Sequence, residues 1–319
     1  MVPEKLINAL RSARHKVFVV STHTQPEGDA LGAQLALASL LRRCGKKVVC
    51  VNQDRPPAEY AFLPDIDRLC RESWPRDYDV CVLVDCSDVT RIGGLRARVR
   101  ADRLIVNIDH HVSNTRFGGV NWVQPRASSA CEMIHALYKA MRVSLRRDEA
   151  LQIYTGLMTD TGSFRFAGTT ARTHAVAADL LRHRLDVAGI YRKVHEELSF
   201  AAVVAMGHVV RTLRRSRCGT VAWLTVSRGL LRRFPELVSR TDDLIRFARS
   251  IAGVEVAFLF KEVGPGEVRV NLRSCRGRDV NKIARRFGGG GHPMASGCTV
   301  RGTLASAVRR LVGAARRST

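Results

Sequence analysis

The most restrictive feature of this sequence is a set of short segments that are apolar at almost every position. They are KVFVVST (16–22), DVCVLVDC (79–86) and RLIVNID (103–109), and helical patterns such as DALGAQLALASLLRRCG (29–45) separate them. A strand that is apolar on both sides must be covered on both sides, which is typical of a parallel sheet. We therefore predict an α/β fold: a parallel sheet with helices on both faces.

The pattern changes after about residue 215. Strand-like segments then follow one another more closely, as TVAWLTVS (220–227), VEVAFLFKEV (254–263) and EVRVNLRS (267–274). This change predicts a smaller C-terminal α/β domain. We expect a catalytic domain over residues 1–190, a helical linker over 191–215 and a second domain over 216–319, with the active site in the cleft between the two domains.

The charge of the chain is strongly positive and unevenly distributed. The net charge is +23, and residues 211–319 alone hold 23 Lys and Arg against 7 Asp and Glu. Such an excess favours an anionic partner, nucleic acid first. An arginine-rich overall composition is the alternative explanation.

Nothing in the sequence predicts export or a membrane span. The nine cysteines include no C-x-x-C pair, which favours buried thiols in a reducing compartment over disulfides or structural zinc. The longest weakly polar run, residues 30–41, is too short to cross a bilayer. We expect a soluble cytoplasmic protein.

Polar side chains with metal-binding chemistry follow three predicted strands. The first strand leads to His23, the second to Asp85, and the third to Asp109, His110 and His111. Ligands bind an open parallel sheet outside the carboxyl ends of its strands. One such residue is often only a helix cap, but three strand ends together predict a site.

Three more carboxylates join this set. Glu27 and Asp29 lie just beyond His23, and Asp160 ends an apolar helical pattern, where the helix dipole disfavours an anion unless a cation compensates. The candidate metal ligands are His23, Glu27, Asp29, Asp85, His110 and Asp160. Their oxygen-rich chemistry favours two Mn²⁺ ions, with Mg²⁺ or Co²⁺ as alternatives, and such pairs typically cleave phosphoesters.

These segments resemble the motifs of the DHH phosphoesterases, which are named for the triplet seen here at 109–111. HTQPEGDALGA (23–33), VLVDCSD (82–88), IDHHVSN (108–114) and GLMTDTGSFRF (156–166) are similar to four motifs of the catalytic domain. VNLRS and FGGGGHPMASG are similar to motifs of the DHH-associated C-terminal domain. The layout is most like the NrnA-type nanoRNase and pAp phosphatases.

The resemblance implies a role for each site residue. His23, Glu27 and Asp85 would hold one metal, and Asp29, Asp85, His110 and Asp160 the other. His111 would serve the leaving oxygen, Asp109 would orient a histidine, and Asn114 would contact phosphate. The family usually has Asp where this chain has Glu27, which puts the geometry of the first metal in question.

In the second domain, the resemblance and the residues both indicate substrate binding. The candidates are Arg273, Ser274, Gly289, Gly290, Gly291 and His292. Glycines let a backbone approach an anion closely, and arginine binds phosphate in a bidentate manner. The expected substrates are short oligoribonucleotides or adenosine 3′,5′-bisphosphate.

Three questions stay open from the sequence. A c-di-AMP or pApA phosphodiesterase would use the same metal site, and a non-catalytic RNA-binding protein would also suit the charge of +23. A homodimer is compatible with the chain but is not indicated by any motif.

Overall fold

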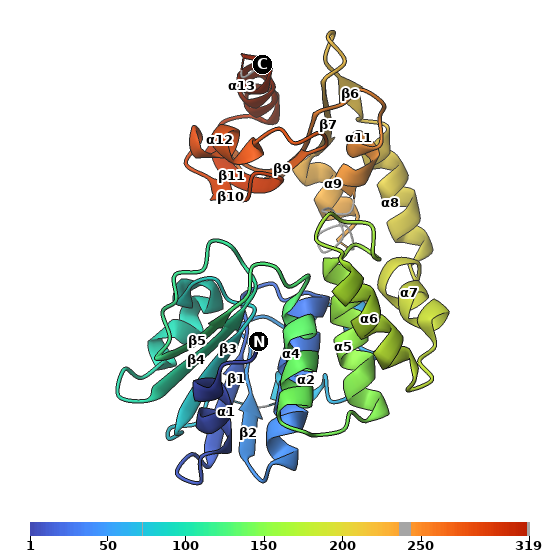
Figure 1. Cartoon of the computed structure of the whole chain (residues 1–319). Coiled ribbons are helices and arrows are strands. Elements are labelled where there is room, and N and C mark those ends of the chain that lie inside the picture. The colour runs from blue at the N-terminus through green and yellow to red at the C-terminus, as the bar shows by residue number, and fades with distance from the viewer. Residues whose placement is uncertain (72, 236–243, 318–319) are drawn as a thin grey trace. The chain divides into compact units, whose positions relative to one another are not determined.

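The computed structural model describes residues 1–71, 73–235 and 244–317. The chain forms two compact units, Met1–Glu197 and Leu198–Thr319, and each is described by itself (Figure 1). The division falls inside the range 191–215, where a helical linker is predicted. Within the described ranges, no helix is both long enough and apolar enough to span a membrane.

The N-terminal unit is built on a five-stranded sheet in which all neighbouring strands are parallel. Its order is β2-β1-β3-β4-β5, and the strands are β1 (Val17–Ser21), β2 (Lys47–Cys50), β3 (Val80–Val84), β4 (Leu104–Asp109) and β5 (Val120–Val123). The chain leaves β1 toward β2 and then returns to the other side of β1 for β3, which makes a switch point between β1 and β3. The predicted parallel sheet is confirmed; β5 was not predicted.

Both faces of this sheet are buried, which explains the continuously apolar strands. Along β1, Phe18 and Val20 contact the main helical core, whereas Val19 packs on the opposite face with Tyr78 and Ile92. The elements around the sheet are α1 (Glu4–Arg11), α2 (Gly28–Arg43), η1 (Ala58–Tyr60), α3 (Arg68–Arg71), η2 (Val89–Arg98), α4 (Ala130–Ala140), α5 (Arg147–Asp160), α6 (Ala171–Leu181) and α7 (Val187–His195). Helices α2 and α4 cover the face that carries Phe18 and Val20, and α5 packs against both of these helices (Figure 1). The segment η2 packs on the opposite face, with Val19.

The C-terminal unit is built on a six-stranded mixed sheet of order β10-β11-β9-β8-β7-β6. Only β7 and β8 are parallel among the paired neighbours. The strands are β6 (Arg214–Arg215), β7 (Val221–Val226), β8 (Val256–Gly264), β9 (Glu267–Ser274), β10 (Gly290–Gly291) and β11 (Ala295–Arg301). The described helices are α8 (Phe200–Val210), α9 (Arg228–Arg233), α11 (Ile245–Arg249), α12 (Val280–Arg285) and α13 (Leu304–Arg317), and two apolar clusters lie on the two faces of the sheet.

Candidate metal centre

The carboxyl ends of β1, β3 and β4 bring the predicted site residues together beside the switch point. Asp85 follows the last residue of β3, and β4 ends at Asp109, directly before His110. His23 lies two residues beyond β1. Because these strands are neighbours in the sheet, side chains separated by dozens of residues meet at one edge.

The imidazole of His110 lies at the centre of the cluster. Its Nε2 atom is 3.4 Å from Asp160 Oδ2, 3.5 Å from Asp85 Oδ1 and 3.8 Å from Asp29 Oδ2. On the other side of Asp85, the Oδ2 atom is 3.4 Å from His23 Nε2. Five of the six predicted metal ligands therefore converge, and Asp85 is shared between the two histidines.

The two converging histidines are oriented in the same way. Nδ1 of His110 is 3.3 Å from the carbonyl oxygen of Ala127, and Nδ1 of His23 is 2.8 Å from that of Thr24. A carbonyl can only accept, so each Nδ1 carries the hydrogen and each Nε2 faces the carboxylates. This is the arrangement that metal-ligating histidines adopt in proteins.

Asp29 is held by the beginning of another helix. Its two carboxylate oxygens accept hydrogen bonds from the backbone N–H groups of Ala130 (2.6 Å) and Cys131 (2.8 Å), the first residues of α4. The exposed N–H groups and the dipole at this helix end favour a carboxylate. Asp29 is thereby fixed although it is almost completely buried.

Two glycines let α5 approach α2, and this contact delivers Asp160. A Cβ atom at Gly156 would lie 2.3 Å from Cys131 Sγ and 2.9 Å from Asp29 Cα, and one at Gly32 would lie 2.3 Å from a backbone oxygen of α5. Only glycine accommodates backbone this close. Since Asp160 lies one helical turn after Gly156, the close approach places its carboxylate beside His110.

Asp85 has an unusual backbone and an unpaired oxygen. Its φ of 55° lies in the left-handed region, which Asp tolerates better than most residues. Its Oδ1 atom is buried and accepts no hydrogen bond from the described residues. A buried carboxylate oxygen without a donor costs free energy unless a cation compensates, so this residue fits a metal ligand.

The charges of the cluster shift its protonation equilibria. Burial opposes charge on His110, but the close carboxylate of Asp85 and the charges of Asp160 and Asp29 outweigh burial and raise the pKa of His110 to about 11. Burial and the charge of Asp85 raise the pKa of Asp29 to about 6. Burial and the charge of Asp29 raise the pKa of Asp160 well above its ordinary value.

The raised pKa values of His110, Asp29 and Asp160 have one common explanation. Without a metal, the crowded carboxylates keep protons in the cluster. Divalent cations would replace those protons, so the donor set fits the metals that the sequence predicts.

His111 has a different set of partners. Its Nδ1 atom is 2.7 Å from Oδ1 of Asp109, which is completely buried. Asn114 Nδ2 donates to the other oxygen of Asp109 (2.6 Å) and to Asn107 Oδ1 (2.8 Å). Asp109 therefore orients His111, and the amide of Asn114, predicted to contact phosphate, is engaged by Asp109.

Glu27 stands apart from the converged residues. It precedes the first residue of α2, its side chain is exposed, and it belongs to neither of the close ligand groups, Asp85–His110–His111 and Asp29–His110–Asp160. Burial lowers the pKa of His23, but Asp85, the Thr24 carbonyl and, to a smaller extent, the charge of Glu27 raise it, so that the net shift is upward. Glu27 is thus near enough to influence the charge of the cluster, although it belongs to neither ligand group.

The predicted substrate residues of the C-terminal unit lie along one end of its sheet. Arg273 on β9 pairs with Ala295 on β11, and Gly291 on β10 pairs with Ser296, whose hydroxyl donates to the carbonyl of His292 (2.8 Å). The backbone N–H of Ser274 donates to the carbonyl oxygen of Met294 (2.9 Å).

The glycines of this unit are not equivalent. A Cβ at Gly289 would lie 2.2 Å from a carbonyl oxygen of β11, and Gly291 has a φ of 140°, so both are needed for the backbone pairing itself. Gly290, in contrast, has open space where a Cβ would be.

Sequence reasoning missed two kinds of supporting residue. Asn107 is buried inside β4 and donates to the carbonyls of Leu83 (3.2 Å) and Cys86 (3.0 Å), which ties β4 to the end of β3. A single amide in an apolar strand was the available signal. Gly32 and Gly156, two glycines inside helical patterns, were the signal for the close contact of α2 and α5.

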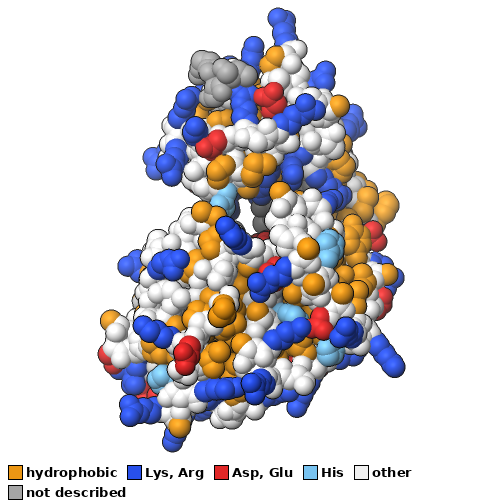
Figure 2. Space-filling model, viewed as in Figure 1, with side chains coloured by type: hydrophobic (Ala, Val, Ile, Leu, Met, Phe, Trp, Pro, Cys, Tyr) orange, Lys and Arg blue, Asp and Glu red, His pale blue; other side chains and the backbone are white. Residues whose placement is uncertain are grey.

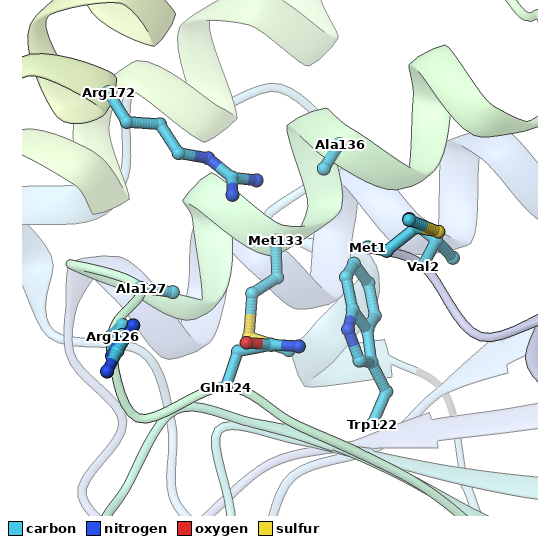
Figure 3. A pocket seen from close by; sticks show the side chains of 9 residues that line it. All are labelled: Met1, Val2, Trp122, Gln124, Arg126, Ala127, Met133, Ala136 and Arg172. Carbon is cyan, nitrogen blue, oxygen red and sulfur yellow. The ribbon is translucent and has the colours of Figure 1, made fainter.

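A cavity of about 150 Å³ lies elsewhere in the N-terminal unit, between β5, α4 and the first residues (Figure 3). Trp122 and Met133 line it, and Trp122 is only 2% exposed, so its ring packs in the core instead of offering a face to a base. None of the predicted site residues lines this cavity. The cavity adjoins the metal centre only through Ala127, whose carbonyl oxygen lies 3.3 Å from His110 Nδ1.

Comparison with known proteins identifies the family of the chain. Residues 17–157 match the DHH family, N-terminal domain, and residues 239–317 match the DHHA1 domain. The bifunctional oligoribonuclease and PAP phosphatase NrnA of Thermus thermophilus is 31% identical over 321 residues, covering 98% of this chain and 93% of that protein.

Solved structures give the same result. The crystal structure of an exopolyphosphatase-related protein from Bacteroides fragilis has a TM-score of 0.89 and 25% identity, covering 98% of this chain and 95% of the other. RecJ from Thermus thermophilus in complex with Mn²⁺ has a TM-score of 0.56 and 16% identity, covering 98% of this chain and 54% of the other, and shares the fold alone. The chain belongs to the DHH family, with a DHH domain followed by a DHHA1 domain.

Proposed function

We propose that this protein is a metal-dependent phosphoesterase that hydrolyses short oligoribonucleotides, adenosine 3′,5′-bisphosphate or both. The observation that carries the proposal is the convergence of His23, Asp29, Asp85, His110 and Asp160 at the switch point of the sheet. The similarity to a bifunctional oligoribonuclease and PAP phosphatase along 98% of the chain supports this substrate class.

The converged residues would hold two divalent cations. His23 and Asp85 would bind one ion, with Glu27 completing the set, and Asp29, Asp85, His110 and Asp160 would bind the other. We propose Mn²⁺, with Mg²⁺ or Co²⁺ as substitutes, because the donors are mainly carboxylate oxygens with two imidazoles. Bound ions would supply the Lewis acidity that offsets phosphoryl charge and lowers the pKa of a water.

The neighbouring residues would position the substrate and its protons. His111 is oriented through Nδ1 by Asp109, which leaves its Nε2 as the nitrogen to protonate the leaving oxygen. Asn114 keeps Asp109 in place.

In the DHHA1 domain, Arg273, Ser274, His292 and the glycines at 289–291 would bind the terminal phosphate and the sugar or base of the substrate. Arg273 suits a phosphate because its guanidinium presents two parallel donors. Gly290 suits close approach because nothing occupies the space where a Cβ would lie.

The proposed substrates are intracellular nucleotides, so we propose that the protein acts in the cytoplasm. A homodimer stays a prediction. Neither alternative, a cyclic-dinucleotide phosphodiesterase or a non-catalytic RNA-binding protein, is favoured over the oligoribonuclease and adenosine 3′,5′-bisphosphate phosphatase.

The test is a substrate panel with Mn²⁺ or with chelator. The panel contains adenosine 3′,5′-bisphosphate, 5′-phosphorylated RNA of two to five nucleotides, a longer RNA and c-di-AMP. Asp85→Asn should abolish turnover, whereas Asp102→Asn, which alters an exposed carboxylate paired with Arg100, should not. Absence of hydrolysis with Mn²⁺ would contradict the proposal, and preferential cleavage of c-di-AMP would replace its substrate.

A further inference from the structure

The turn between β6 and β7 carries a concentration of exposed arginines. The segment RTLRRSRCGT (211–220) contains Arg211, Arg214, Arg215 and Arg217, and all four are exposed. The turn extends away from the rest of the C-terminal unit (Figure 1). These four residues are called the basic hairpin below.

Among the described residues, no carboxylate pairs with the basic hairpin. The guanidinium of Arg214 instead donates to the backbone carbonyls of Arg211 (3.3 Å) and Leu213 (2.9 Å). Glu255 lies at the base of the turn, where its backbone N–H donates to the carbonyl oxygen of Thr220. Its carboxylate accepts a hydrogen bond from Arg278 instead (2.8 Å).

A distant segment adds positive charge at the same place. Cys218 lies in the turn, and hydrogen bonds with Ser216 and Thr220 lower its pKa to about 6. The charge of Arg316, near the end of α13, contributes to that lowering. Residues about a hundred positions apart therefore strengthen one positive potential.

The basic hairpin is separate from the predicted substrate residues. β6 and β10 form opposite edges of the six-stranded sheet. Five strand spacings of about 4.8 Å place these edges roughly 24 Å apart, and β9, which carries Arg273 and Ser274, lies three spacings, or roughly 14 Å, from β6. The hairpin therefore offers a second surface for an anion.

We propose that the basic hairpin binds the phosphate backbone of single-stranded RNA that is longer than the proposed substrates. Unpaired, exposed guanidinium groups bind phosphates without regard to base sequence and release counterions on binding. The turn itself, residues 216–219, reads Ser-Arg-Cys-Gly and contains no large apolar side chain. A membrane surface is less suited to it, because interfacial segments use aromatic or leucine anchors.

This surface is part of a wider charge pattern. Figure 2 shows Lys and Arg side chains spread over both units on the face drawn, with few acidic side chains between them. A test must therefore separate the hairpin from the general charge. The control is a variant that removes the same charge from α9 of the same unit.

The binding experiment compares wild type, Arg214→Gln/Arg215→Gln/Arg217→Gln and the control Arg228→Gln/Arg232→Gln/Arg233→Gln. A labelled 20-nucleotide poly(U) RNA is titrated between 50 and 200 mM salt with chelator present, and fluorescence anisotropy is measured. Losing three phosphate contacts should reduce the slope of log K against log salt by about 2 and weaken binding at 50 mM salt at least tenfold. The control should retain most of the affinity and slope.

Three outcomes would overturn the inference: unchanged RNA binding by the hairpin variant, equal losses in the control, or loss of binding to phosphatidylglycerol vesicles with RNA binding intact. Alkylation of Cys218 by iodoacetamide, read by peptide mass spectrometry, provides a second measurement. Cys218 is exposed, and bound RNA should slow its alkylation severalfold; no protection would also contradict the inference.

The inference does not depend on the proposed hydrolase activity. Hydrolysis of adenosine 3′,5′-bisphosphate with Mn²⁺ is measured separately on all three proteins, and the hairpin variant should match wild type. If none of them hydrolyses it, the proposed function fails while the RNA-binding result still decides the role of the hairpin.

Discussion

Gly156→Ala tests whether the close contact of α5 with α2 builds the metal centre. The new methyl group would lie 2.3 Å from Cys131 Sγ and 2.9 Å from Asp29 Cα. Carbon atoms prefer about 3.5–4.0 Å, so the two helices must separate by about half an ångström or more. The movement would displace Asp29 relative to Asp160.

Two opposing effects set the size of the change in stability. Alanine is the better helix former by about 1 kcal/mol, whereas overpacking a tight core costs about 1–3 kcal/mol. We expect overpacking to win, because one contact is to backbone that cannot rotate away. A net loss of up to about 2 kcal/mol should lower Tm by up to about 6 °C. Displacement of one ligand should weaken Mn²⁺ binding by about tenfold or more.

Thermal unfolding and Mn²⁺ titration calorimetry measure the two effects, and Cys131→Ala separates them. Removing Sγ from the Gly156→Ala background relieves the shortest contact, so the double variant should recover stability beyond the sum of the single changes. Mn²⁺ affinity should stay reduced, because the contact with Asp29 Cα persists. A higher Tm for Gly156→Ala, together with an unchanged Mn²⁺ affinity, would refute the reasoning.

Five further perturbations test other parts of the structure. Asn114→Ala should lower kcat about 10- to 100-fold with Mn²⁺ affinity nearly unchanged, because His111 loses its fixed orientation; calorimetry and steady-state kinetics distinguish the two quantities. Glu27→Gln should weaken Mn²⁺ binding by about tenfold at most, whereas Asp85→Asn should abolish Mn²⁺ binding at the site that Asp85 shares with His23. Metal titrations measure both effects. Hydrogen bonds outweigh burial and lower the pKa of Glu149 in the folded protein. The stability that Glu149 contributes is therefore present above its unfolded pKa, near 4.5, and is lost as pH falls through its lower folded pKa. Glu149→Gln should make Tm depend less on pH in that acidic range. Chelation should lower Tm, since ligand at a hundred times Kd stabilises by about 2.7 kcal/mol.

The edge of the sheet where the site lies could be predicted from the sequence because parallel strands align their carboxyl ends. Once three apolar runs were identified, His23, Asp85 and His110 had to lie at one edge. The role of Asp160 followed from the electrostatics of a helix end. Both arguments need only local patterns and the rules of sheet topology.

The support of Asp29 could not be predicted in the same way. Its carboxylate is bound by the N–H groups of Ala130 and Cys131, about a hundred residues away, and that contact exists only because helices α2, α4 and α5 pack together. Helix packing depends on the shapes of many side chains, which a periodic pattern does not encode. The glycine run shows a related limit: a ligand cradle and tight pairing of β10 with β11 both require Gly289 and Gly291.

The two adjacent histidines show how the structure goes further than residue type. Both imidazoles approach the same oxygen of Asp85, at 3.5 Å for His110 and 3.6 Å for His111. They differ in the nitrogen that they present: His110 offers Nε2, because Nδ1 faces a backbone carbonyl, whereas His111 offers Nδ1, which Asp109 also engages. A metal at Asp85 would therefore replace a proton on Nε2 of His110, whereas Nδ1 of His111 is already engaged by Asp109. The acceptor behind each ring thus distinguishes two neighbours of identical type, in line with the proposed roles of His110 as a metal ligand and His111 as a proton donor.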